Sequence, residues 1–219
     1  MSDPRIRVLL ADDHAAIRAG MRLMLEQAPD IVVVGEAADG AVAVRQAGAL
    51  RPDVVLMDIR MPGTDGIAAT RAITSAGVAD VLILTTFDFD DYLFGALRAG
   101  AAGFLLKSVE PAALIDAVRR VADGDGFLAP EVTRRLLTAF AAAAPEPARP
   151  VTTPALDGLT ERERDVLAGL GRGLSNAGLA AELAISRATA KTHVSRVLGK
   201  LGCTSRVQAA ILAKEAGLA

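Results

Sequence analysis

Five short apolar segments alternate with helical patterns over the first 126 residues, and this alternation restricts the possible fold more than any other feature. Strands that are buried on both faces of a sheet have such a continuous apolar character. Between the segments, apolar residues recur at helical spacing. The apolar segments are 6–11, 31–34, 54–57, 81–84 and 103–106, and the helical ones are 17–28, 41–49, 66–75, 90–98 and 111–122. We therefore predict an α/β fold with a doubly wound, five-stranded parallel sheet that is flavodoxin-like and carries helices on both faces.

The remainder of the chain has a different character. Residues 130–143 predict one more helix, because Pro130 suits a first helical turn and an apolar stripe follows it. Residues 144–158 contain four prolines among alanines, which favours a semi-extended linker. The last 61 residues fit four short helices. We predict an α/β domain at 1–126, a linker helix and Pro/Ala-rich linker at 127–158, and an all-α domain at 159–219.

Charge is distributed unevenly along the chain. The net charge is −2, yet residues 159–219 hold nine basic and five acidic residues and so carry +4, which leaves −6 on residues 1–158. An acidic front part suits cations, and a basic tail suits a polyanion. The single cysteine, Cys203, excludes an internal disulfide and a cysteine-based zinc site. Neither a signal peptide nor a long apolar run is present, so we expect a cytoplasmic protein without membrane contact.

Ionisable and hydroxyl side chains cluster where the predicted strands end. Because the carboxyl ends of parallel strands share one edge of a sheet, these side chains are expected to converge. Any one aspartate there has an ordinary explanation as a helix cap or loop carboxylate. The whole set favours a site where Mg²⁺ offsets the charge of a phosphoryl group and one aspartate is the nucleophile. The residues concerned are Asp12, Asp13, Asp58, Thr85, Thr86 and Lys107.

The segments 9–14, 55–63, 82–86 and 103–107 resemble the receiver domain of two-component response regulators. The resemblance implies that Asp58 accepts phosphate from a sensor histidine kinase. It also implies that Mg²⁺ is bound by Asp13, Asp58 and the backbone carbonyl of Arg60, with help from Asp12. Lys107 and a threonine hydroxyl would bind the phosphate, and the receiver spacing favours Thr85 over Thr86. Phe104 occupies the position of the switch aromatic.

Three residues need comment beside this resemblance. Ser108 follows Lys107 where many receivers have proline, and Arg60 is a bulky neighbour for the phosphate. Neither change removes a required group. His14 starts the first helix, and we expect a surface position rather than a catalytic base.

The segment 186–201 predicts an amphipathic helix with one apolar and one polar, basic face. The apolar stripe contains Ala190, Val194, Val197, Leu198 and Leu201. The opposite face has no acidic residue; it contains Thr189, Thr192, Ser195, Arg196 and Lys200 and is flanked by Lys191 and His193. Such a face suits either solvent or the major groove of DNA. The short helix and turn before it, at 174–186, complete a helix-turn-helix and favour DNA.

The segments 159–167, 173–176, 189–193 and 206–210 resemble the four-helix DNA-binding domain of LuxR-type regulators, and the whole chain resembles the NarL/FixJ class. The resemblance implies base contacts by Lys191, Thr192 and Ser195, and dimerisation through 205–216. The backbone contacts would come from Thr189, His193, Arg196 and Lys200. The chain departs from the LuxR pattern at Gly178, Ala190 and Gly199.

These features predict a transcription regulator whose dimerisation and DNA binding respond to phosphorylation, and whose own chemistry is limited to gaining and losing that phosphate. Its expected partners are a histidine kinase, double-stranded DNA, a second copy of the chain and RNA polymerase. A phosphatase of the haloacid-dehalogenase type is disfavoured, because Arg60 stands where that class has a second aspartate. DNA binding that ignores phosphate is disfavoured, because the acidic set is complete.

Overall fold

A parallel sheet with the strand order β2-β1-β3-β4-β5-β6 forms the centre of the front domain. The computed structural model describes residues 5–85, 90–128, 156 and 158–218. The five predicted strands are confirmed, and the two-residue strand β6 extends the sheet by pairing with β5. Two residues are too few to produce a periodic pattern. The strands are β1 (Ile6–Ala11), β2 (Ile31–Ala37), β3 (Val54–Asp58), β4 (Asp80–Thr85), β5 (Gly103–Leu106) and β6 (Phe127–Leu128).

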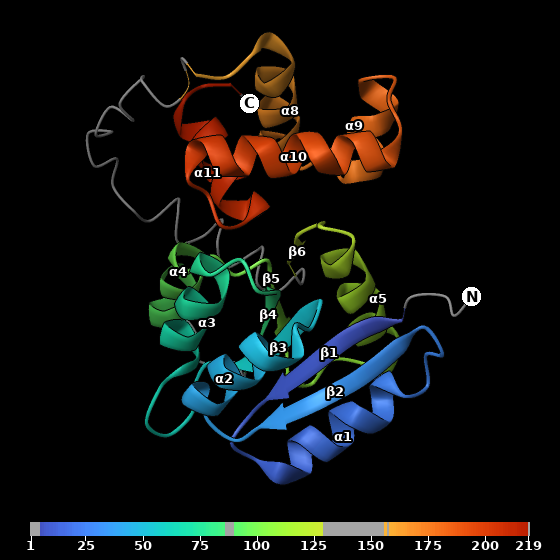
Figure 1. The fold of residues 1–219 in the computed structure, drawn as a ribbon, viewed down its shortest axis with the longest axis vertical. Coiled ribbons are helices and arrows are strands. Elements are labelled where there is room, and N and C mark those ends of the chain that lie inside the picture. Colours follow the sequence, from blue (N-terminus) through green and yellow to red (C-terminus); the bar gives the residue numbers. More distant parts are fainter. Residues whose placement is uncertain (1–4, 86–89, 129–155, 157, 219) are drawn as a thin grey trace.

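Helices cover both faces of this sheet, as a doubly wound fold requires (Figure 1). Two helices, α1 (Ala15–Leu25) and α5 (Pro111–Ala122), pack together on one face. The other face carries α2 (Gly40–Leu50), α3 (Gly66–Ser75) and α4 (Asp90–Arg98). The strands between these layers are almost wholly buried, so they anchor the loops that follow them.

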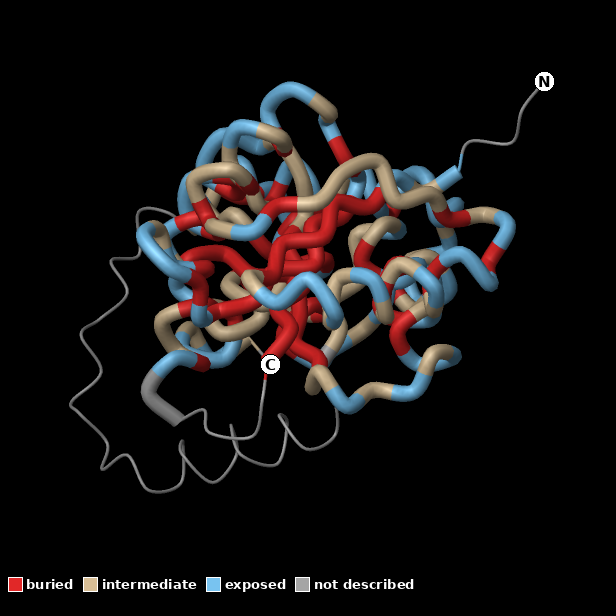
Figure 2. Tube along the Cα trace, turned by 90° about the horizontal axis from the view of Figure 1, so that it is seen from below, coloured by how far each residue is buried: buried red, intermediate tan, exposed pale blue. Residues whose placement is uncertain are grey.

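The tail forms four helices around a core of its own. They are α8 (Glu161–Gly171), α9 (Asn176–Glu182), α10 (Arg187–Leu201) and α11 (Arg206–Glu215). Thr160 and Glu163 form the capping box that starts α8. The side chains of Ser175 and Ser186 cap α9 and α10. Buried segments fill the middle of each domain in Figure 2.

Three expectations concern residues outside the described part of the chain. They are the helix at 130–143, almost all of the linker at 144–158, and position 86, the alternative to Thr85. Within the described ranges, none of the helices combines the length and apolar character needed to cross a membrane.

The tail packs against the edge of the sheet where strands β3, β4 and β5 begin. Helix α11 contacts α4, and α10 lies over the turn after α5 (Figure 1). Asp58 and Thr85 lie at the opposite ends of β3 and β4. Strand β4 therefore has the tail at its first residue, Asp80, and the acidic residues near its last, about 16 Å away at ~3.3 Å per residue.

Candidate functional site

The ends of β1, β3 and β5 bring Asp12, Asp58 and Lys107 into one pocket. The Lys107 ammonium lies 2.7 Å from Asp12 Oδ2 and 2.8 Å from Asp58 Oδ2. All three side chains are largely buried, with 11% of Lys107, 1% of Asp12 and 7% of Asp58 exposed. Residues that are separated by as many as 95 positions in the sequence thus meet, as the strand-end pattern predicts.

Burial and ion pairing have opposite effects on this pocket. Burial raises the pKa of Asp58 above its usual value, although Lys107 and a backbone hydrogen bond from Arg60 act against this. Burial alone would lower the pKa of Lys107, but its hydrogen bonds to Asp12 and Asp58 outweigh burial and raise it. The ammonium is therefore charged and holds two carboxylates that would otherwise repel each other.

Asp13 lies beside Asp12 at the rim of the pocket. Its Oδ1 is 2.6 Å from His14 Nδ1, and the backbone N–H of His14 donates to Asp12 Oδ1 at 2.9 Å. Among the described residues, Asp12, Asp13 and His14 form a group whose ligand atoms are near enough to hold a metal ion. The carboxylates of Asp12 and Asp13, and that of Asp58 across Lys107 from Asp12, are the hard oxygen ligands that suit Mg²⁺.

Two further predicted residues lie in the strands next to the pocket. Thr85 ends β4 and is buried, and its carbonyl accepts a hydrogen bond from the backbone N–H of Lys107 at 2.7 Å. Phe104 is 1% exposed. Because its ring already points into the core, any switching through Phe104 starts from an inward position.

Gly66 is a site residue that the sequence reasoning did not identify. A Cβ atom at Gly66 would lie 1.9 Å from the backbone oxygen of Asp58, so only glycine fits here. The N–H of Gly66 also donates to the carbonyl of Ile59 at 2.8 Å. The start of α3 thereby fixes the loop that follows Asp58. The only sequence signal is a glycine directly after the helix cap Asp65.

The predicted reading helix α10 has the expected two faces. Ala190, Val194 and Val197 are buried, whereas the predicted contact residues are exposed, except for His193, which is half-buried. Three predicted contact residues have side-chain partners within the tail, and the first is Thr189, whose hydroxyl lies 2.8 Å from that of Ser186. Lys200 donates to Glu163 Oε2 at 2.7 Å and to the carbonyl of Gly158 at 3.2 Å, and the hydroxyl of Thr192 donates to the carbonyl of Ala188.

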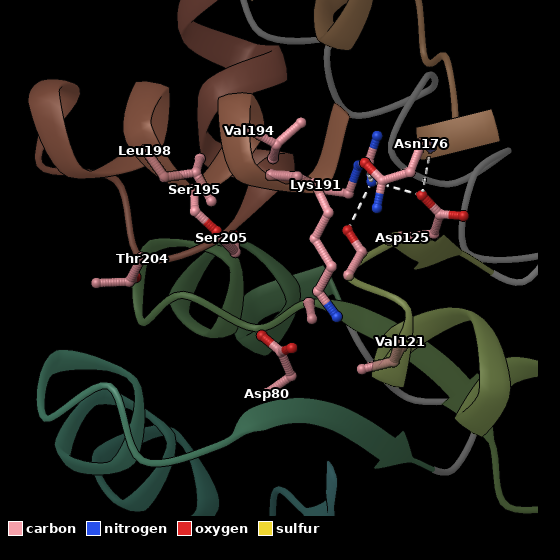
Figure 3. A pocket seen from close by; sticks show the side chains of 14 residues that line it. Asp80, Val121, Asp125, Asn176, Lys191, Val194, Ser195, Leu198, Thr204 and Ser205 are labelled. Carbon is pink, nitrogen blue, oxygen red and sulfur yellow. Dashed lines mark hydrogen bonds and ion pairs between the residues drawn. The ribbon is translucent and has the colours of Figure 1, made fainter. Parts of the chain in front are cut away.

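Part of the reading face of α10 is turned toward the front domain. Lys191 donates to the carbonyl of Ala122 at 3.1 Å, and Arg187 forms an ion pair with Asp123 at 2.9 Å. The side chain of Lys191 extends toward Asp80 (Figure 3). Burial raises the pKa of Asp80, and Lys191 acts against this rise. Lys191 and Ser195 line the pocket between the domains, so the receiver obstructs this part of the face in the observed arrangement.

Helix α11 makes further contacts with the front domain. Arg206 pairs with Asp125 at 2.6 Å and donates to the carbonyl of Gly124, also at 2.6 Å. The amide of Gln208 donates to the carbonyls of Leu97 and Arg98 at 3.1 Å each. None of these interdomain residues was predicted, since polar contacts between domains leave no periodic trace in a sequence.

An α/β domain with an acidic pocket and a four-helix domain with a basic helix together define a signal-responsive DNA-binding protein. Comparison with known families specifies the class. Residues 8–119 match the family described as "Response regulator receiver domain", and residues 157–213 match "Bacterial regulatory proteins, luxR family". The chain belongs to the response regulators with a LuxR-type DNA-binding domain.

Relatives share this organisation over almost their whole length. The transcriptional regulatory protein LiaR of Bacillus subtilis is 40% identical over 209 residues, which cover 95% of this chain and 96% of LiaR. The nitrate/nitrite response regulator protein NarL of Escherichia coli K12 is 35% identical over 205 residues, or 93% of each chain. The crystal structure of ChrA, a response regulator of a heme-sensing two-component system, has 42% identity and a TM-score of 0.56 and covers 99% of this chain. The protein is thus a DNA-binding response regulator of the NarL/LuxR type.

Proposed function

We propose that Asp58 accepts a phosphoryl group from a sensor histidine kinase and that this event releases the reading helix α10 from the front domain. The observation that carries the proposal is the arrangement of the two sites. The acidic pocket lies at one edge of the sheet, and the tail is held at the other edge by the end of α4 and the turn after α5. Chemistry at Asp58 can therefore act on the tail only through the body of this domain.

The chemistry follows from the groups in the pocket. Asp12, Asp13, Asp58 and the carbonyl of Arg60 would hold Mg²⁺, and the bound ion would offset negative charge on the incoming phosphoryl group. A carboxylate oxygen of Asp58 attacks phosphorus, and the bond to the kinase histidine breaks. Lys107 is only 2.8 Å from Asp58 and is placed to pair with a phosphate oxygen. The hydroxyl of Thr85 would donate a hydrogen bond to a second phosphate oxygen.

The new charge changes the balance in the pocket. Lys107 now pairs with a phosphate instead of bridging Asp12 and Asp58, and its backbone N–H is bonded to the carbonyl of Thr85. Movement of Lys107 shifts β4 and β5, and Asp80 at the start of β4 and Ala102 just before β5 line the pocket between the domains. Such a local change in charge, read out by an element with two arrangements, is a general form of switching.

Release of the tail has two consequences. The base edges of DNA can then be contacted by Lys191, Thr192 and Ser195. The phosphate backbone can be contacted by Thr189, His193 and Arg196, and also by Lys200 once it leaves Glu163. Helix α11 becomes available to a second copy of the chain, so that a dimer reads paired half-sites. The bound dimer would act on RNA polymerase in the cytoplasm, and the receiver would catalyse no reaction beyond its own phosphorylation and dephosphorylation.

Intact-protein mass spectrometry tests the first step. The full chain is incubated with acetyl phosphate and Mg²⁺, together with Asp58→Asn and the control Asp116→Asn, which removes an exposed carboxylate from α5. We expect a phosphoryl adduct on the wild type and on Asp116→Asn but not on Asp58→Asn. An adduct that persists in Asp58→Asn would refute the assignment.

Fluorescence anisotropy with a labelled duplex tests the second step. We expect the phosphodonor to raise the DNA affinity of the wild type and of Asp116→Asn and to leave that of Asp58→Asn unchanged. Equal affinities of all three proteins after treatment would show that DNA binding ignores phosphate.

A further inference from the structure

Receiver carboxylates face the basic residues of the tail across the domain interface. Asp123 pairs with Arg187, Asp125 pairs with Arg206, and Asp80 lies opposite Lys191 (Figure 3). Lys191 belongs to the face that the LuxR resemblance assigns to DNA. The receiver thus presents negative charge to this face where a bound duplex would present its phosphates.

The contact at Arg206 is the most enclosed of these pairs. Its side chain is 10% exposed, and that of Asp125 is 15% exposed. A single carboxylate oxygen, Asp125 Oδ1, accepts from Arg206 Nη1 at 2.6 Å and from the backbone N–H of Asn176 at 2.8 Å. Two donors of the tail therefore converge on one anionic oxygen of the receiver.

The tail itself holds this pair of donors in position. Arg206 Nη2 donates to the carbonyl of Leu174 at 2.6 Å, a bond that lies within the tail and does not depend on the receiver. Arg206 and Asn176 line a pocket between the two domains, and the same pocket is lined by Lys191 and Ser195, two of the expected base-reading residues. When the receiver departs, the guanidinium remains beside the reading face with Nη1 directed toward the vacated position.

We propose that Arg206 and Asn176 form an anion site that binds a phosphate of the DNA backbone, and that Asp125 occupies this site while the tail is docked. A guanidinium stays charged at any physiological pH and binds carboxylate and phosphate oxygens with the same geometry. The proposal rests on DNA binding by α10, as proposed above. It adds a residue of α11 to the DNA interface and makes Asp125 a competitor of DNA.

This assignment and a purely structural tie between the domains predict opposite results for one variant. If Arg206 only ties the tail to the receiver, then Arg206→Gln frees the tail and raises DNA affinity, as Asp125→Asn does. If Arg206 also binds a phosphate, Asp125→Asn raises the affinity for DNA, and adding Arg206→Gln to Asp125→Asn cancels this gain.

The experiment measures the affinity of the unphosphorylated full chain for a fluorescein-labelled duplex of random sequence, because phosphate contacts carry no sequence information. We expect Asp125→Asn to bind about tenfold more tightly than wild type, since the apparent affinity scales with the fraction of open molecules. Asp125→Asn with Arg206→Gln should lose this gain. The slope of log affinity against log salt should fall by about 0.9, the value for one phosphate contact.

Matched controls separate this site from general effects of charge. Asp116→Asn removes an exposed receiver carboxylate away from the interface, and Arg172→Gln removes an exposed arginine of the tail that pairs with Glu182. Neither should change affinity or salt slope by a comparable amount. Arg206→Lys in the Asp125→Asn background keeps the charge, so its salt slope should match that of Asp125→Asn even if the loss of the Leu174 bond weakens the tail.

Three results would overturn the proposal. They are an Arg206→Gln chain that binds DNA more tightly than wild type, a double variant that keeps the gain, and a salt slope unchanged by Arg206→Gln. The phosphate switch is tested separately. If the phosphodonor has no effect on wild-type binding while the Arg206 results hold, the proposed switch fails and the anion site stands.

Discussion

Replacing Lys107 by methionine tests the electrostatics of the acidic pocket in the absence of phosphate. Methionine keeps most of the apolar stem but removes the ammonium that lies within 2.8 Å of both Asp12 and Asp58. Two buried carboxylates then face each other without a cation. Breaking a buried ion pair on one side costs about 3–5 kcal/mol. We take ~3 kcal/mol here, because burial already raises the pKa of Asp58 and lets that carboxyl accept a proton.

This loss translates into a large change in melting temperature. At roughly 4 °C per kcal/mol, the front domain should melt about 12 °C lower in EDTA. Added Mg²⁺ should restore part of the loss, because a divalent ion at Asp12, Asp13 and Asp58 replaces the missing positive charge. The variant should therefore gain more stability from Mg²⁺ than the wild type gains.

Tyrosine fluorescence is a suitable probe for this melting experiment. The chain has no tryptophan and a single tyrosine, Tyr92, which lies in α4 of the front domain. The control is Arg119→Met, because Arg119 pairs with Asp30 on the surface, where 47% and 43% of the two side chains are exposed. A surface pair contributes about 0–1 kcal/mol. Two results would refute the reasoning: an equal fall in melting temperature in the two variants, or a melting temperature of Lys107→Met that does not change when Mg²⁺ is added.

Two further predictions concern Gly66 and Glu163. Gly66→Ala should lower the melting temperature and abolish the phosphoryl adduct at Asp58, because the added Cβ would clash with the Asp58 carbonyl. The control Gly48→Ala has open space around it and should stabilise α2 by up to ~1 kcal/mol. Thermal melts and mass spectrometry measure both variants, and a normally phosphorylated Gly66→Ala would contradict the prediction. Hydrogen bonds from Lys200 and Thr160 lower the pKa of Glu163 to about 2, so its ionised form stabilises the tail at neutral pH and this contribution fades as the pH falls toward about 2. Glu163→Gln should therefore reduce the urea midpoint of the tail, followed by circular dichroism, at neutral pH but not near pH 2, and an equal difference at both would speak against this pair.

The fold and the acidic pocket were largely predictable because both depend on strong local patterns. The buried strands have continuous apolar segments, and a parallel sheet places their carboxyl ends together whatever the details of the loops. Asp12, Asp58 and Lys107 could therefore be grouped before their distances were known. Strand β6 was not predicted, because its two residues are too few to produce a periodic pattern.

The contacts between the domains could not be predicted, for a physical reason. Asp125 and Arg206 are separated by 81 positions and meet only because the tail docks at one edge of the sheet. Neither residue belongs to a periodic pattern, and each looks like an ordinary surface charge in sequence. Lys200 is a different case: the reading-face pattern assigns it to DNA, and in the structure it pairs within the tail with Glu163, 37 positions away.

Gln208 has a consequence for how such proteins can be recombined. Its amide donates to the carbonyls of Leu97 and Arg98 in the last turn of α4, where a helix end leaves carbonyls without intrahelical partners, and Leu97 also accepts from the N–H of Gly100. A receiver grafted onto the tail of a relative that lacks glutamine at this position would lose both of these interdomain hydrogen bonds and would dock less tightly. Receiver and tail are therefore matched parts rather than interchangeable modules, and a working chimera must carry the residue at 208 with its own α4.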